Sequence, residues 1–321
     1  MDEKSCFIAL SFIKGLGDVL ISRLVEGCGS AENVFKQART PGALARIGGI
    51  GPETEKIVKN FSDWQKVEKE ISEARKRDFE ILTLSDDRYP ENLKQIYSAP
   101  AVLYVFGEIK KRDLLSVAIV GSRSPSKYGT DSATFLSSEL AAVGVCVVSG
   151  MARGIDSSAH KAAINAGGRT VAVLGSGLDF IYPPENHELY NSIAKNGAVI
   201  SAFPLGTEPD KTNFPQRNSV ISGLSLGTVV IQASNKSGSL ITANLALEHG
   251  REVFAVPGRI GEKMSGGTNS LIKKGAKLVE NISDITEEIP LIKHLKNRTD
   301  DTSAQNSKKF ASLSEEKKKT S

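Results

Sequence analysis

The 321-residue sequence has few cysteines and histidines and no long hydrophobic run. Its 3 cysteines, Cys6, Cys28 and Cys146, are odd in number and form no CxxC pair, which argues against a disulfide framework or a zinc site and is typical of a reducing cytosol. Its 4 histidines show no metal-ligand spacing. The apolar stretches are far shorter than the roughly 18–20 residues of a membrane helix, and the N-terminus lacks a signal-peptide pattern. We therefore expect a cytoplasmic protein without a membrane segment or a metal.

A surplus of positive charge is also absent from most of the chain. The net charge is +4, with 41 basic and 37 acidic side chains. Residues 1–111 carry 17 of each sign, residues 112–290 carry 16 of each, and residues 291–321 carry 8 basic and 4 acidic side chains. The polar composition of residues 291–321 predicts a disordered tail. An anion-binding site elsewhere must therefore arise from local placement of charges.

Two similar glycine turns are present near the N-terminus. Residues 13–17 and 47–51 share the pattern hydrophobic-x-Gly-hydrophobic-Gly, are 34 residues apart, and each precedes a helical pattern. They predict a tandem helix-hairpin-helix unit, whose backbone N–H groups could hold a phosphate or whose glycines could only make tight turns. A further helix is predicted over 62–77, with one apolar face and its charged side chains in solvent.

Apolar runs of strand length follow, and from residue 117 they alternate with helical stretches. Most runs consist of Val, Ile, Ala and Leu, as in strands that are covered on both faces. The alternation predicts a mostly parallel sheet with helices on both faces. The expected strands are 79–84, 101–106, 117–120, 145–149, 170–174, 198–201, 228–232, 253–256 and 276–279.

Glycine, serine and basic residues are concentrated where these strands end, which is the edge at which open parallel sheets bind ligands. Glycine allows close approach of a ligand, successive N–H groups bind anions, arginine fits phosphate, and an aromatic ring can stack on a base. The glycines and serines of a single loop could serve only to start the next helix. Because five such loops share one edge, ligand binding is favoured over that alternative. The predicted nucleic-acid-binding residues are Gly121, Ser122, Arg123, Gly150, Arg153, Gly154, Lys211, Phe214, Arg217, Asn218, Ser237, Gly238 and Ser239.

Motifs of nucleotide-dependent enzymes are missing. There is no GxxxxGK[ST] loop and no GxSxG elbow, and Gly175-x-Gly177 is followed by Phe180 where a dinucleotide fingerprint needs glycine. Asp156 is interpreted as a helix cap and His160 as a packed core histidine. We therefore predict no catalytic residue and no cofactor.

Several longer motifs follow one another in chain order between residues 80 and 285. They include Gly121-Ser122-Arg123, Ser149-Gly150-x-Ala152-x-Gly154-Ile155-Asp156, Phe214-Pro215-x-Arg217-Asn218, Ser237-Gly238-Ser239-Leu240-Ile241-Thr242-Ala243 and Gly266-Gly267-Thr268-Asn269. In this set and order the chain resembles the DNA-processing protein A family, also called DprA or Smf.

The resemblance implies an α/β fold in which an extended Rossmann-like, mostly parallel sheet with helices on both faces follows a small all-α, SAM-like helix-hairpin-helix domain. The expected division is a helical domain over 1–77, a single-stranded-DNA-binding domain over 78–290 and the polar tail over 291–321. The C-terminal winged-helix domain of many members is expected to be lacking.

The resemblance also implies a function. Members are cytoplasmic proteins of natural transformation and recombination that bind and protect incoming single-stranded DNA, form homodimers and load RecA recombinase, without catalysis. The family's single-strand pocket involves an arginine, a lysine and a phenylalanine, and the resemblance implies that Arg123, Lys211 and Phe214 are these residues here. An alternative is a nucleotide phosphoribohydrolase-type enzyme on the same architecture, but the Pro-Gly-Gly-x-Gly-Thr-x-x-Glu element of that group is missing.

Three positions depart from the family pattern. Ala202 and Gln232 stand where glutamate is usual, and Ser219 stands where arginine is usual. Because two acids and one base are replaced together, we interpret them as a charge network that has been neutralised in this chain.

Overall fold

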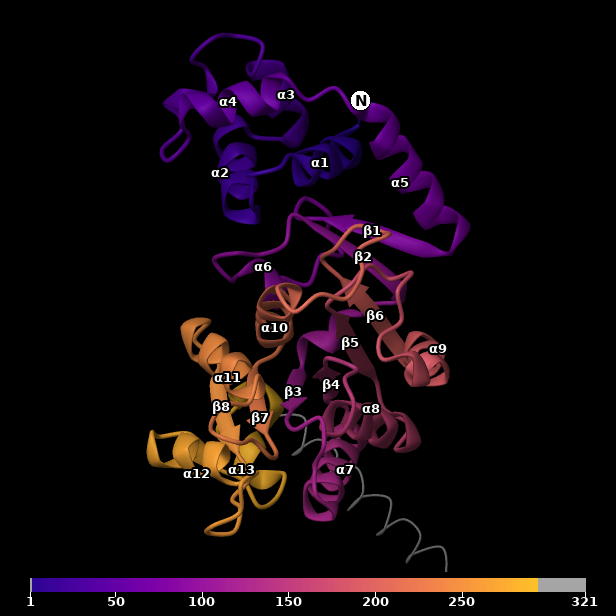
Figure 1. Ribbon diagram of the computed structural model, residues 1–321, viewed down its shortest axis with the longest axis vertical. Coiled ribbons are helices and arrows are strands. Elements are labelled where there is room, and N and C mark those ends of the chain that lie inside the picture. Colours follow the sequence, from indigo (N-terminus) through magenta and orange to yellow (C-terminus); the bar gives the residue numbers. More distant parts are fainter. Residues whose placement is uncertain (1, 294–321) are drawn as a thin grey trace, which may run out of the picture.

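The N-terminal segment folds into short helices, as the glycine turns predict. The computed structural model describes residues 2–293; the predicted tail lies outside them except for residues 291–293, of which Ile292 is fully buried in the core. Figure 1 shows these helices at one end of an elongated molecule. They are α1 (Glu3–Phe12), α2 (Asp18–Cys28), α3 (Ala31–Gln37), the 3-10 helix η1 (Leu44–Arg46), α4 (Pro52–Lys59) and α5 (Trp64–Lys76).

Both predicted hairpins form. Gly15 and Gly49 adopt the left-handed conformation, with φ of 88° and 83°, which glycine reaches without a steric penalty. Gly17 and Gly51 then cap α2 and α4. The two hairpins differ in their first arm, because α1 is a full helix whereas η1 is a single 3-10 turn.

The remaining elements build one sheet of nine strands and its covering helices. In chain order they are β1 (Phe79–Thr83), α6 (Glu91–Lys94), β2 (Val102–Gly107), η2 (Lys111–Leu114), β3 (Ser116–Val120), α7 (Lys127–Ala142), β4 (Cys146–Ser149), α8 (Ile155–Asn165), β5 (Thr170–Leu174), η3 (Pro184–Asn186), α9 (His187–Asn196), β6 (Gly197–Ser201), α10 (Asn213–Leu224), β7 (Gly227–Val230), α11 (Ser239–Glu248), β8 (Glu252–Ala255), α12 (Gly266–Lys273), β9 (Lys277–Leu278) and α13 (Ser283–Thr286).

The sheet has the strand order β1-β2-β6-β5-β4-β3-β7-β8-β9. From β3 the chain adds β4, β5 and β6 in parallel on one side, and it then crosses back to add β7, β8 and β9 in parallel on the other side. The hairpin of β1 and β2 closes the far edge in antiparallel pairing. The direction of winding therefore reverses between β3 and β7, which is where open α/β sheets leave a crevice for ligands.

Alternate side chains of the central strands enter two separate cores, as the period of a strand requires. On β3, Val117 and Ile119 pack with α7 and α8, whereas Ala118 and Val120 pack with α10 and α11. The predicted coverage of both faces is therefore confirmed. No helix within residues 2–293 is long and apolar enough to cross a membrane.

The N-terminal helices share a hydrophobic core with the antiparallel edge of the sheet. Their buried residues, such as Phe7 and Leu10, belong to one cluster with Ile81, Tyr104 and Tyr190. On α5 the predicted apolar face is confirmed by the burial of Val67 and Ala74. One charged position differs from the expectation, because Glu70 on the same helix is only 9% exposed.

Candidate nucleic-acid interface

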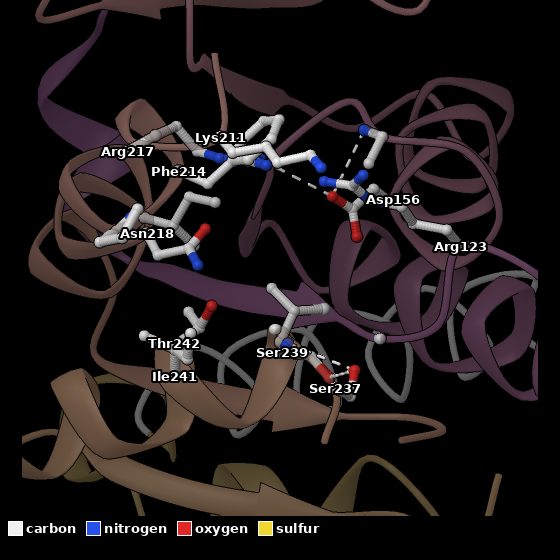
Figure 2. Close-up of a pocket in the computed structure, with 16 residues that line it drawn as sticks. Arg123, Asp156, Lys211, Phe214, Arg217, Asn218, Ser237, Ser239, Ile241 and Thr242 are labelled. Carbon is white, nitrogen blue, oxygen red and sulfur yellow. Dashed lines mark hydrogen bonds and ion pairs between the residues drawn. The ribbon is translucent and has the colours of Figure 1, made fainter. Parts of the chain in front are cut away.

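A pocket of about 440 Å³ opens at the carboxyl ends of β3 and β7, at the point where the winding of the sheet reverses. Figure 2 shows side chains from four parts of the chain around it: the loop after β3, the start of α8, the segment that leads into α10 together with α10 itself, and the start of α11. The lining residues are Val120, Gly121, Arg123, Ala152, Asp156, Lys211, Phe214, Pro215, Arg217, Asn218, Ile221, Ser237, Gly238, Ser239, Ile241 and Thr242.

Two arginines lie beside the Phe214 ring, and Lys211 lines the same pocket. The guanidinium carbons of Arg123 and Arg217 lie 4.8 Å and 5.5 Å from the ring centre, within the range of cation–π attraction. Arg123 and Lys211 are exposed, and neither forms an ion pair with any residue in the range 2–293. The pocket therefore combines an aromatic surface with cations that are free to meet a phosphate.

Arg217 differs from the other two cations because it is buried, with 6% of its surface exposed. Its Nη1 lies 3.9 Å from Asp156 Oδ2, and both Nε and Nη1 are without a hydrogen-bond partner. Burial lowers the pKa of Arg217, although the Asp156 charge counteracts this. A buried donor without a partner is costly, and Asp156 is the charged group that faces this guanidinium.

Asp156 does not cap α8, contrary to the sequence-based interpretation. The N-cap is Gly154, and Asp156 is the second residue of the helix. Its Oδ2 accepts hydrogen bonds from the backbone N–H groups of Gly150 and Ala152, at 3.2 Å and 3.4 Å. Burial raises the pKa of Asp156, and the Arg217 charge acts in the opposite direction. The carboxylate thus holds the loop after β4 and faces Arg217.

The structure brings most of the predicted residues together. Those that line the pocket are Gly121, Arg123, Lys211, Phe214, Arg217, Asn218, Ser237, Gly238 and Ser239. The sequence reasoning missed Asp156, Ile241 and Thr242, although they stand within the Gly/Ser motifs. Their place in those motifs was the signal that could have indicated them.

Four predicted residues lie outside this lining. Arg153 is exposed and pairs with Glu185 through Nη2 and Oε2 at 3.0 Å. Ser122 is buried, and its hydroxyl accepts a hydrogen bond from the Ser124 backbone. Gly154 has a φ of 76°, and a Cβ there would collide with the Ser122 carbonyl oxygen. Gly150 leaves room for the Arg217 guanidinium.

Of the three departures from the family pattern, Gln232 has a clear local role. Its Oε1 accepts from the Ser126 backbone N–H at 2.9 Å, and its Nε2 lies 2.8 Å from the Ser126 hydroxyl. Ser126 caps α7, so Gln232 ties the start of that helix to the segment that follows β7. The Ser219 hydroxyl is buried without a partner, and nothing in the described structure joins it to Gln232.

His160 is fully buried on α8, as expected for a packed histidine. Its Nδ1 lies 2.6 Å from the Thr170 hydroxyl, which in turn donates to the Val147 carbonyl. Burial lowers the pKa of His160 to about 3. Within residues 2–293 no group of three or more His, Cys, Asp or Glu side chains could hold a metal ion.

Comparisons with known proteins agree with the motifs. The family model of DNA recombination-mediator protein A matches residues 80–290. DNA processing protein DprA of Bacillus subtilis is 43% identical over 231 residues, which cover 71% of this chain and 77% of that protein. Protein Smf of Synechocystis is 39% identical over 285 residues, which cover 86% of this chain and 70% of that protein.

Two solved structures share the fold. DNA processing protein A of Streptococcus pneumoniae superimposes with a TM-score of 0.76 at 37% identity, over 89% of this chain and 98% of that chain. The Helicobacter pylori protein, described for its unique single-stranded DNA binding mode, has a TM-score of 0.59 at 34% identity, over 68% of this chain and 96% of that chain. The chain belongs to the DNA recombination-mediator protein A family.

Proposed function

We propose that this protein binds single-stranded DNA in the pocket between β3, β7 and α10, and that it acts as a recombination mediator. The observation that carries the proposal is the placement of Arg123 and Arg217 beside the ring of Phe214, with Lys211 in the same pocket. Proteins that bind single strands combine cations that track the backbone with aromatic rings on which bases stack. The described binding of single-stranded DNA by the Helicobacter pylori relative supports the same ligand.

The roles of the residues follow from their exposure. Arg123 and Lys211 stand at the rim, where they can neutralise phosphates. Phe214 offers its ring to a base, and the guanidinium of Arg217 adds positive charge to the pocket wall. Gly121 and Gly238 leave backbone N–H groups open to close approach. These contacts favour single strands over duplex, because a duplex keeps its bases stacked and away from Phe214.

Binding without catalysis is the second part of the proposal. Asp156 is the carboxylate that lines the pocket, and it is engaged by Arg217 and two backbone N–H groups. A phosphoribohydrolase-type enzyme would need a carboxylate placed to act on a sugar. Release of ribose 5-phosphate from nucleoside monophosphates would favour that enzyme and contradict the proposal.

Loading of RecA recombinase, protection of incoming strands and homodimer formation complete the proposal and depend on the family resemblance. A second copy could pair along β9, an edge strand whose Lys277 and Leu278 are exposed. A cytoplasmic location suits the three cysteines, all of which are free and buried. Light scattering tests the dimer, and RecA filament growth on strands coated with single-strand-binding protein tests the loading.

Salt-dependent binding of oligothymidine and of a duplex of the same length tests the central claim. We expect tighter binding of the single strand and a linear fall of log affinity with log salt concentration. Lys211→Ala should weaken binding to all sequences and reduce the salt slope by about 0.7, the value for one single-strand phosphate contact. Lys161→Ala, which removes an exposed lysine of α8 outside the pocket, is the control. Equal affinity for duplex and single strand would contradict the proposal.

A further inference from the structure

Two carboxylates of the N-terminal helices reach across to the chain segment that forms one wall of the pocket. This segment runs from Leu205, in the loop after β6, to Gln216 on α10. Lys211 and Phe214 lie between these two residues in the sequence. Figure 1 shows α2 and α5 beyond the antiparallel strands β1 and β2, and α10 beside α6. None of these contacts touches the pocket itself, and the binding role proposed above does not use them.

The first contact comes from the hairpin that joins α1 and α2. Asp18 is the first residue of α2, and its Oδ1 accepts a hydrogen bond of 2.9 Å from the backbone N–H of Ala101, the residue before β2. Its Oδ2 accepts a hydrogen bond of 3.3 Å from Gln216 Nε2. Gln216 stands between Pro215 and Arg217, so the hairpin holds α10 beside the pocket residues.

The second contact comes from α5. Glu70 Oε1 accepts a hydrogen bond of 2.8 Å from the Leu205 backbone N–H. The next residue, Gly206, donates its N–H to both carboxylate oxygens of Asp179, at 3.0 Å and 2.9 Å. The loop is therefore held at its start by a carboxylate of the helical unit and by one of the loop after β5. Glu70 is only 9% exposed, and a carboxylate buried to this degree is unfavourable unless its partners compensate.

We propose that Asp18 and Glu70 are positioning residues for single-stranded DNA binding, which fix residues 205–216 so that Lys211 and Phe214 face the pocket. The proposal deepens the DNA-binding function above and depends on it. It gives the helical unit a role that needs no contact with DNA. It also favours the packing interpretation of the first glycine turn, since Asp18 directs the start of α2 toward α10 and β2.

The physical basis is preorganisation. A loop that samples many conformations binds with an affinity reduced by the fraction of time spent in the competent one. In the bound state a variant that lacks a positioning contact neutralises as many phosphates as the parent protein does. The salt dependence of its affinity should therefore equal that of the parent. Loss of a positioning contact therefore lowers affinity at every salt concentration by one factor, whereas loss of a phosphate contact also lowers the slope.

The test compares Glu70→Ala, Glu70→Gln and Gln216→Ala in the full chain, with oligothymidine as the probe. Glu68→Ala, which removes an exposed charge from the same helix, is the matched control. We expect Glu70→Ala to weaken binding about tenfold, the effect of a tenfold smaller competent fraction, with an unchanged salt slope. Glu70→Gln keeps an acceptor for Leu205 and should bind within about threefold of the parent, a change of under 1 kcal/mol. Gln216→Ala should weaken binding in the same direction as Glu70→Ala.

Hydrogen exchange of the free proteins gives a readout that does not need DNA. Backbone N–H groups of residues 205–214 should exchange faster in Glu70→Ala than in the parent or in Glu68→Ala, while β3 and β4 keep their protection. Parent-like binding by Glu70→Ala, or Gln and Ala variants that are equally weak, would overturn the positioning role. If the parent protein bound no oligonucleotide, the proposed function would fail, and exchange at 205–214 would still decide whether Glu70 fixes the segment.

Discussion

The guanidinium carbon of Arg123 lies 4.8 Å from the centre of the Phe214 ring, although Arg123 follows β3 and Phe214 belongs to α10. The two side chains bring a charge for the phosphate and a surface for the base into one place. Gly175, in the loop after β5, leaves room for the Phe214 ring, because a Cβ at this position would lie 3.2 Å from the ring. The pair is thus built from the loop after β3, the first turn of α10 and the loop after β5.

Replacement of Arg123 by alanine should weaken oligothymidine binding and reduce the salt slope by about 0.7, since one phosphate contact is lost. The matched variant is Arg153→Ala, because Arg153 is also an exposed arginine of the loop edge but pairs with Glu185 outside the pocket. We expect Arg153→Ala to bind like the parent. Fluorescence anisotropy at several salt concentrations measures both, and equal losses in the two variants would argue against the pocket as the site.

Phe214→Ala should cost about 1–3 kcal/mol of binding free energy, the usual value of one base–aromatic stack. Phe214→Tyr keeps the ring and should retain most of the affinity. Since no charge changes, both variants should keep the salt slope of the parent. Calorimetric titration with oligothymidine checks this, and a tyrosine variant as weak as the alanine variant would show that Phe214 does not stack.

Gly150→Ala should displace Arg217, because the added Cβ would collide with Arg217 Nη1 and lie 2.8 Å from Asp156 Oδ2. Forcing extra atoms into a packed site typically costs about 1–3 kcal/mol of unfolding free energy, and binding should weaken as well. Gly238→Ala is the control in the same pocket, since its Cβ would meet nothing within 4 Å. Urea unfolding measures both, and a stable Gly150→Ala variant with parent affinity would contradict the packing.

His160 should make the fold less stable in acid. Its pKa in the folded protein is lowered from 6.5 to about 3 by burial, so the unfolded chain binds a proton in this range and the folded protein does not. The unfolding free energy attributable to His160 is therefore full above pH 6.5 and falls as the pH drops, by at most about 1.4 kcal/mol per pH unit. The raised pKa values of Asp18, Glu70 and Asp156 act in the opposite direction.

Comparison with His160→Asn isolates the histidine. Asparagine keeps a donor for Thr170 but does not titrate, so its unfolding free energy should change less between pH 7 and pH 5 than that of the parent. Denaturant unfolding at the two pH values gives the difference. An identical pH dependence in both proteins would mean that His160 is protonated when folded.

The elements of the fold were predictable because their signals are local. The apolar run at 117–120 indicates a strand without reference to any other residue, and Gly15 and Gly49 indicate turns in the same way. The position of β7 beside β3 was not predictable, because the inner strands carry nearly interchangeable apolar runs. The burial of Glu70 was also hidden, since its partner is the backbone N–H of Leu205, which has no sequence signature.

In the candidate site, too, residues with a local sequence signal were predictable and long-range pairings were not. Arg123, Lys211 and Phe214 were identifiable because they follow strands that end at one edge of the sheet. Arg153 has the same kind of position, but its partner Glu185 lies in a separate 3-10 turn that no local pattern connects to it. Ser122 and Gly154 belong to the motifs that indicated the site, but they do not line the pocket. The Ser122 hydroxyl instead accepts a hydrogen bond from the Ser124 backbone, and the missing Cβ of Gly154 allows the close approach of the segments after β3 and before α8.

The crossing of the chain from β6 back to β7 sets an order of events during synthesis. Until residues 227–230 have left the ribosome, β3 is the outer strand of a partial sheet, with its apolar side chains and one row of backbone groups unpaired. A nascent chain that already contains Arg123, Lys211 and Phe214 still lacks the wall of Ser237 and Ser239. The pocket therefore receives its last wall only after β7 has joined β3.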